Sequence, residues 1–259
     1  MKRTSFLLLL FGFAVVANSF SPTSVMRSFL VNKDSSPPNN NGKPSTKGTT
    51  TTTTTTTPKR IIQSNEEAVN IIDTCVMERV SHRELFTAVK YVERYAYEHY
   101  PNLASKSALW HRAHGSFELV FSTGGADSRT FRAPPKFLPF SYAMIDDEYF
   151  GNGVGLDRDT IWISMLHKHH YDPNIRRMVV TLRDIYIRGH KVTRMIPPFL
   201  RKKLNVGKNP RDFTDKDPPT FVIVGVTDRA LIARGNQSGG LAIWSRMETD
   251  IRPVAYKEK

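Results

Sequence analysis

The chain has 259 residues and a formal net charge of +13 at pH 7, from 37 Lys and Arg against 24 Asp and Glu. Eight of the cations but only one acid precede residue 61, which leaves 29 basic and 23 acidic residues, near +6, for the rest. Its only cysteine, Cys75, excludes an internal disulfide framework, so the fold depends on its apolar core. The basic residues lack an interleaved aromatic platform, which argues against nucleic-acid binding.

Residues 1–19 have the three parts of a secretory signal peptide. A cationic start at Lys2 is followed by an apolar stretch over 6–16 and by small residues just before Phe20. The apolar stretch is about half of the roughly twenty residues that a membrane-spanning helix needs. We therefore expect a removable leader rather than a retained anchor.

Residues 20–60 read as a disordered linker. They are rich in Ser, Thr, Pro and Asn, contain the threonine run 49–57, and hold the single acid Asp34. A basic, hydroxylated, acid-poor segment is also typical of plastid transit peptides. Behind a signal peptide it resembles the bipartite presequence of algae whose plastids lie inside extra membranes, and this implies a plastid location for residues 61–259. The alternative is a secreted protein with a disordered stalk.

Residues 61–100 have the apolar spacing of two helices, with three or four residues between successive apolar positions. Ser64 is a candidate N-cap for the first helix. Ser81, with Glu84 three residues later, matches a capping box for the second. We therefore expect a helical pair ahead of the rest of the fold.

After Leu109 the pattern changes to short alternating segments bounded by turn residues. With seven or more short strands and no intervening helix of crossover length, the fold class is mainly β: an antiparallel lipocalin-like barrel or strongly curled sheet, preceded by the helical pair (α+β). The expected strands are 117–123, 142–145, 149–156, 160–166, 178–188, 191–195, 220–227, 229–234 and 241–245.

Residues 196–219 interrupt this series. Five prolines surround the basic run Arg201-Lys202-Lys203, and prolines at this density cannot donate to a central strand ladder. We expect a long loop with one short helix over 199–204. A lid over the barrel mouth and a disordered insertion both fit such a loop.

No catalytic apparatus is evident. The acids of 146–148 are adjacent, so they do not form a spaced carboxylate pair. The histidines of 167–170, and separately His111 and His114, lack a completing ligand in a recognisable spacing, and a solvated loop is expected at 167–170. We predict no metal, no cofactor and no enzymatic activity; for an enzyme acting on a lipid, 146–148 and 167–170 are where polar groups would have to converge.

Two stretches carry a resemblance to a known family. Gly115–Thr123 reads G-S-F-E-L-V-F-S-T, and Asp228–Asn236 reads D-R-A-L-I-A-R-G-N ahead of the apolar Leu241–Arg246. In this order, behind a helical preamble, they resemble the first and closing strands of the plastid lipid-associated proteins, or plastid fibrillins, over roughly 85–246. Arg234-Gly235 is retained. Three positions depart from the family, with Phe117 in place of its Trp, Phe121 of its Tyr and Leu231 of its first Arg, which indicates a divergent member.

The resemblance implies a lipocalin-like barrel in plastids that binds a hydrophobic lipid or isoprenoid, peripheral to a thylakoid or to the surface of a plastoglobule, a lipid globule of the chloroplast stroma. Burial of an acyl or prenyl chain in such a barrel yields about 0.8 kcal/mol per methylene. Arg234 is expected to stack on Phe117 and, with Gly115 and Gly235, to close the barrel. The alternative is a non-catalytic assembly factor that docks a thylakoid protein, its barrel fully packed. Candidate ligand-lining residues, each of which also fits plain core, are Phe117, Leu119, Phe121, Trp162, Phe221 and Trp244.

Overall fold

The structure is a computed structural model that describes residues 61–99, 103–134, 140–204, 206–212, 220–235 and 238–251. The predicted leader and linker, 1–60, lie outside these ranges. Within them, no helix combines the length and the hydropathy needed to cross a bilayer.

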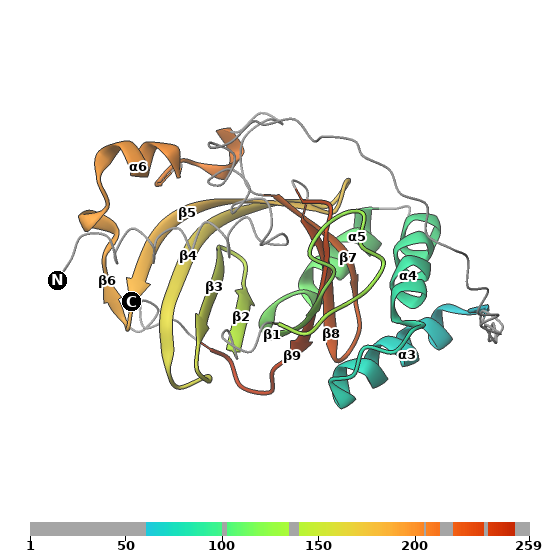
Figure 1. The fold of residues 1–259 in the computed structure, drawn as a ribbon. Helices are drawn as coiled ribbons and strands as arrows, with labels where there is room; N and C mark the ends of the chain where they lie inside the picture. Colours follow the sequence, from blue (N-terminus) through green and yellow to red (C-terminus); the bar gives the residue numbers. More distant parts are fainter. Residues whose placement is uncertain are drawn as a thin grey trace, which may run out of the picture.

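The strands of the described residues form one antiparallel sheet, in which eight strands close into a barrel (Figure 1). Around the barrel the order is β1-β2-β3-β4-β5-β7-β8-β9, with β9 paired back to β1, while the short β6 extends the edge of β5. This confirms the predicted fold class. The strands are β1 (Gly115–Ser122), β2 (Phe140–Ile145), β3 (Tyr149–Gly155), β4 (Ile161–Asp172), β5 (Arg177–Ile187), β6 (His190–Lys191), β7 (Thr220–Val226), β8 (Ala230–Gly235) and β9 (Leu241–Arg246).

Helices precede the barrel, as predicted, but there are three in the described residues rather than a pair: α3 (Asn65–Glu78), α4 (Leu85–His99) and α5 (Leu103–Arg112). Ser64 caps α3, since its Oγ accepts a hydrogen bond of 3.1 Å from the backbone N–H of Glu67. The capping box predicted at Ser81 is wrong. The chain makes a turn there, in which the N–H of Leu85 donates to the carbonyl of His82, and α4 begins only at Leu85.

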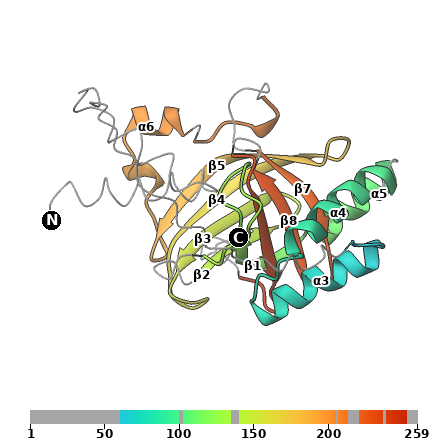
Figure 2. The ribbon, with the colours of Figure 1, turned by 45° about the vertical axis from the view of Figure 1, so that its right-hand side comes forward.

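The first two helices cover the outside of one barrel wall. Figure 2 shows α3 and α4 along the strands β7 and β8. Their buried side chains, such as Ile72 and Val89, pack against outward residues of β1, β7, β8 and β9, such as Val224 and Ile243, to form an outer core. At Gly225 the approach is so close that a Cβ would lie 2.7 Å from Cγ1 of Val92. Glycine is therefore required where α4 crosses β7.

The third helix closes one end of the barrel. Leu109 and Trp110 of α5, with Ala113 just after it, pack with inward side chains of all eight barrel strands, among them Phe117 and Phe150, and this inner core fills that end. The Trp110 ring stacks on Tyr171 of β4, with centroids 4.4 Å apart. This helix was missed because the periodic pattern ends near Tyr100.

The Pro-rich segment is ordered where the structure describes it. It contains β6, the 3-10 turn η1 (Thr193–Met195), α6 (Pro198–Lys203) and the 3-10 turn η2 (Pro210–Asp212). The predicted short helix is thus confirmed within a residue at each end, whereas the predicted strand 191–195 is reduced to β6 and a turn. Ile196 is buried against Met165, Leu182 and Ile185. The described part of the segment therefore packs on the barrel, while 213–219 lie outside the described residues.

The solvated loop predicted at the histidines of 167–170 is wrong. His167, His169 and His170 lie within β4, which extends to Asp172, and His167 is buried. An imidazole that stays neutral can occupy an inward strand position, and a pattern based on polarity alone does not detect this.

Candidate functional site: the barrel interior

Side-chain alternation decides which predicted ligand-lining residues face inward. Phe117 is fully buried in the inner core. Leu119 and Trp244 lie directly opposite each other on β1 and β9, on the same inward face, and both are only half-buried. Phe221 is also inward and half-buried, its ring 5.6 Å from that of Phe150. The structure therefore brings four of the six predicted residues onto the inner wall.

The other two point outward. A β-bulge between Leu119 and Phe121 inserts one residue into β1, so Phe121 turns to the outer core and packs beneath the helices. Trp162 alternates with the inward Ile163 and lies half-buried on the outer face of β4. Neither residue therefore lines the interior.

The three closure residues have local roles. Gly115 adopts φ +127° and leaves room for Nη1 of Arg246, which would lie 3.0 Å from a Cβ. The N–H of Gly235 donates to the carbonyl of Gly240 at 3.0 Å and closes the β8–β9 turn. Arg234 binds Glu93 of α4 and the carbonyl of Gly239; the guanidinium over the Phe117 ring belongs to Arg246 instead. The arginine that stacks on Phe117 is therefore Arg246 of β9, and the prediction that assigned this contact to Arg234 of β8 is wrong.

A polar pair lies on the inner wall. His167 Nε2 is 3.1 Å from Oδ1 of Asn152 on the neighbouring strand. Complete burial lowers the pKa of His167 to about 3, so the ring is neutral and Nε2–H donates to Asn152. Its buried Nδ1 is then a bare acceptor, with no hydrogen-bond partner among the described residues. Sequence reasoning missed this pair: Asn152 falls in a predicted strand, but His167 was placed in a loop, and only the register of β3 on β4 brings the two side chains together.

The interior is not equally filled along its length. The inner core fills the end closed by α5, and Ile196 covers Met165 and Leu182 in another part. Leu119 and Trp244 also face inward; Trp244 packs against the inner core, yet both side chains remain partly exposed. Solvent therefore reaches this part of the inner wall.

A cavity of about 680 Å³ lies outside the barrel, between α3, α4 and the end of β7. Its volume falls in the range of small-molecule sites, and its wall combines apolar and charged groups. The lining includes Val69, Tyr91, Val92, Tyr95, Leu109, Arg112, Val226 and Asp228.

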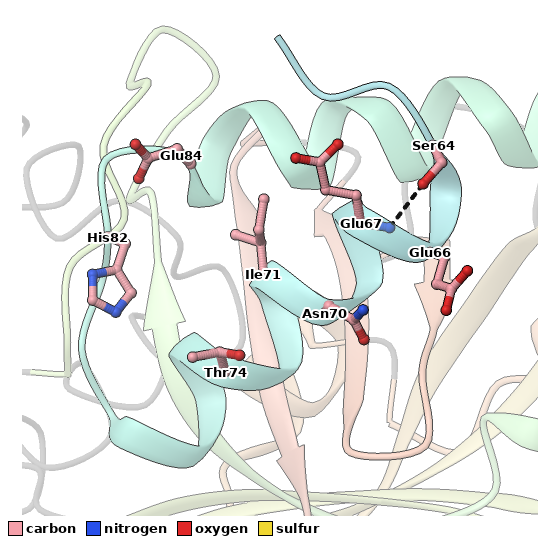
Figure 3. Close-up of a pocket in the computed structure, with 8 residues that line it drawn as sticks. All are labelled: Ser64, Glu66, Glu67, Asn70, Ile71, Thr74, His82 and Glu84. Atoms are coloured by element: carbon pink, nitrogen blue, oxygen red, sulfur yellow. Dashed lines mark hydrogen bonds between the residues drawn. The ribbon is translucent and has the colours of Figure 1, made fainter. Parts of the chain in front are cut away.

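A second outer cavity, of about 610 Å³, lies beside α3 (Figure 3). Carboxylates of Glu66, Glu67 and Glu84 line it together with His82, and Ile71 is its one apolar lining residue. A lining of this polarity does not suit a hydrophobic ligand.

One histidine cluster combines residues far apart in sequence. Ligand atoms of His111, His114 and Asp147 lie within 4.8 Å of one another. Ligands of a tetrahedral zinc ion are about 3.3 Å apart, given Zn–N bonds of about 2.05 Å. The donor types fit a divalent metal, but the spacing is wider than a bound ion requires.

The two segments named for convergent polar chemistry also meet. His169 Nε2 donates to the carbonyl of Asp146 at 2.8 Å. The Asp146 carboxylate is itself occupied by the hairpin turn, accepting from the N–H groups of Glu148 and Tyr149. Burial lowers the pKa of His169. The contact is therefore a backbone bond that fixes the turn, not a carboxylate–imidazole pair.

No known protein family, no curated protein and no solved structure matches this chain. Its class therefore rests on the fold: a closed, eight-stranded antiparallel barrel of the lipocalin-like kind, preceded by helices. Such a barrel is compatible with the binding of a small hydrophobic molecule.

Proposed function

We propose that this protein binds a hydrophobic lipid or isoprenoid, without chemical change, in the part of the barrel interior around Leu119 and Trp244. One observation carries the proposal: these two apolar side chains are cross-strand partners on the inner wall, yet both stay half-buried. Apolar surface that faces inward and still meets solvent is surface that a ligand can cover with a gain in free energy.

The magnitude suits a chain-like ligand. Burial of about fifteen methylenes yields roughly 12 kcal/mol, and subtraction of association costs of at least about 4 kcal/mol leaves the scale of micromolar binding. The bare acceptor on His167 further favours a ligand that carries one hydroxyl or amide donor over a pure hydrocarbon.

The finer form of the proposal is a plastid fibrillin-like protein, peripheral to a thylakoid or lipid globule. Three features support it: the presequence-like composition of 1–60, the two motifs at Gly115–Thr123 and Asp228–Asn236, and the order of helices before barrel. Phe117, at the position of the family's tryptophan, occupies the inner core beneath an arginine.

Tryptophan fluorescence tests the location of the ligand. Trp244 faces the interior and Trp162 the outer wall, and both are half-buried, so they form a matched pair. On titration with a fatty acid or a prenyl alcohol we expect the emission to change, Trp244→Phe to remove most of that change, and Trp162→Phe to preserve it. Loss of the response in Trp162→Phe alone would contradict the proposal.

Ligand content is tested separately. The protein is purified from its native source and its extracted lipids are identified by mass spectrometry, with Leu119→Glu as the variant. We expect lipid from the wild type and a large reduction in the variant, each shown to be folded by circular dichroism. A folded wild-type protein without lipid above background would favour the alternative of an assembly factor. The filled inner core is compatible with that alternative. Retention of lipid in Leu119→Glu but loss in Tyr91→Glu would place the ligand in the cavity beside α4 instead.

A further inference from the structure

The first part of the segment between β5 and β7, residues 188–211, has a one-sided charge, and acids return only at Asp212, Asp215 and Asp217. From Arg188 to Arg211 the sequence contains no Asp or Glu, and its Lys and Arg residues are Arg188, Lys191, Arg194, Arg201, Lys202, Lys203, Lys208 and Arg211. Lys191 is paired with Asp184 of β5 at 2.7 Å. Neither Arg194 nor Lys202 has an ion pair with another described residue. Arg194 and Lys202 therefore present positive charge that no acid of the described residues compensates through an ion pair.

The same segment exposes its largest apolar side chains. Met195 is 69% exposed and Phe199 is 70% exposed, although both lie in ordered elements. Their exposure does not result from a loose segment. Ile196 between them is buried against the barrel, the N–H of Ile185 donates to Thr193 Oγ1 at 2.9 Å, and the N–H of Gly207 donates to the Leu182 carbonyl at 2.8 Å. The fold thus holds Met195 and Phe199 outward.

A basic cavity lies at the same place. It has a volume of about 330 Å³, and its lining contains Arg194, Arg201, Lys202 and Lys208 beside Thr193, Pro198 and Val206. Nε of Arg201 is buried and donates to no atom of the described residues. A buried guanidinium N–H without an acceptor is costly, and a phosphate oxygen would satisfy it.

We infer that this face, the α6 surface (Arg194, Met195, Phe199, Arg201, Lys202 and Lys208), docks the protein on a membrane that contains anionic lipid. The basic cavity would hold the headgroup phosphate while Phe199 and Met195 enter the interface between headgroups and acyl chains. This combination of apolar insertion with cationic attraction is how peripheral proteins bind anionic bilayers. Helix α6 lies on the opposite side of the molecule from α3 and α4 (Figures 1 and 2). The inference does not depend on a ligand in the barrel.

Vesicle co-sedimentation of the full chain tests it. We expect binding to vesicles of phosphatidylcholine with phosphatidylglycerol, weaker binding to phosphatidylcholine alone, and a fall in binding as salt is raised. Arg201→Glu/Lys202→Glu should weaken binding to the anionic vesicles by at least about thirtyfold, from about fivefold per cation removed. Phe199→Ser should weaken binding by a similar factor at every salt concentration, because it removes apolar insertion and leaves the cationic contacts in place.

The control carries the same change of charge on the opposite side. Arg83→Glu/Arg94→Glu alters two exposed arginines at the α3–α4 turn and on α4, and should bind like the wild type. Equal losses in the two double variants would show a general effect of net charge and overturn the inference, as would a wild-type protein that ignores anionic lipid. Binding of inorganic phosphate by a wild-type protein that does not bind anionic vesicles would assign the cavity to a free anion rather than to a membrane. Because lipid content is measured separately, failure of docking and failure of ligand binding can be told apart.

Discussion

The guanidinium of Arg246, at the end of β9, lies over the ring of Phe117 on β1, with Cζ 4.8 Å from the ring centroid. The same group donates to the carbonyl of Arg112, the last residue of α5, and to that of His114 just beyond it, the latter at 2.8 Å. One side chain thus joins the first and the last strand of the barrel to the helix that closes it. Its guanidinium also satisfies carbonyl groups that have no acceptor role within the helix at its C-terminus.

We therefore expect Arg246→Met to destabilise the protein by about 2 kcal/mol, because it removes the cation–π contact and two charge-assisted bonds while it preserves the aliphatic packing. Urea unfolding followed by circular dichroism measures the change. The control is Arg129→Met, an exposed arginine in the β1–β2 connection. Equal unfolding midpoints for Arg246→Met and the wild type would refute the assigned role.

A second arginine attaches α4 to the barrel. Arg234 of β8 makes three hydrogen bonds of 2.8–3.0 Å to the Glu93 carboxylate, and the two side chains are 26% and 13% exposed. A mostly buried, bidentate pair should show a coupling of about 1–3 kcal/mol in a double-mutant cycle with Glu93→Gln and Arg234→Met. The pair Arg94–Glu98 on the same helix is solvated and should show no measurable coupling. Equal coupling energies in the two cycles would show that burial does not determine the strength of the Arg234–Glu93 pair.

The strand positions could be predicted from sequence because alternation and turn residues are local properties. Most of the predicted strands, such as 149–156 and 178–188, agree with the structure to within one or two residues. The direction of side chains could be predicted only as far as alternation holds. The bulge after Leu119 shifts the phase by one residue, which sends Phe121 to the helices although Phe117 stays inside.

Features that depend on distant partners were not predictable. Leu103–Arg112 is short and follows a proline, and its apolar residues Leu109 and Trp110 acquire a core only when the barrel end exists around them. The pair Asn152–His167 likewise requires the register of β3 on β4. The sequence analysis assigned the stacking role to Arg234 of β8, and only the closed barrel shows that Arg246 of β9 meets Phe117.

The contact between α4 and β7 depends on a missing side chain. Gly225→Ala should cost about 1–3 kcal/mol, because the new Cβ would lie 2.7 Å from Cγ1 of Val92. Val92→Ala removes that atom, so the double variant should lose less stability than the sum of the single variants. Gly125→Ala is the control, since a Cβ there meets nothing within 4 Å. Additive losses in the Gly225–Val92 cycle would show that the steric contact is not the cause.

Cys75 should report unfolding. It is fully buried on α3, and burial raises the pKa of its thiol, so little thiolate is exposed to reagent. Reaction with an aromatic disulfide reagent should be slow in the native protein, rapid in denaturant, and accelerated by Arg234→Met, which loosens the neighbouring helix. Rapid labelling of the native protein, at the rate of a free thiol, would show that α3 leaves the barrel without global unfolding.

The buried His167 should make the protein sensitive to acid. Its pKa falls from an ordinary 6.5 to about 3 in the folded state, so between these values the unfolded chain binds a proton that the folded chain refuses. Stability from this group is therefore complete above pH 6.5 and is lost as pH falls, by about 2 kcal/mol between pH 7 and pH 5. His167→Gln does not titrate and can still donate to Asn152, so its unfolding midpoint in urea should change less over this range than that of the wild type. His114 and His169, whose pKa values burial also lowers, contribute equally to both proteins and cancel in the comparison. The exposed His190→Gln should follow the wild type, and an identical pH dependence for His167→Gln would mean that the imidazole is hydrated in the folded barrel.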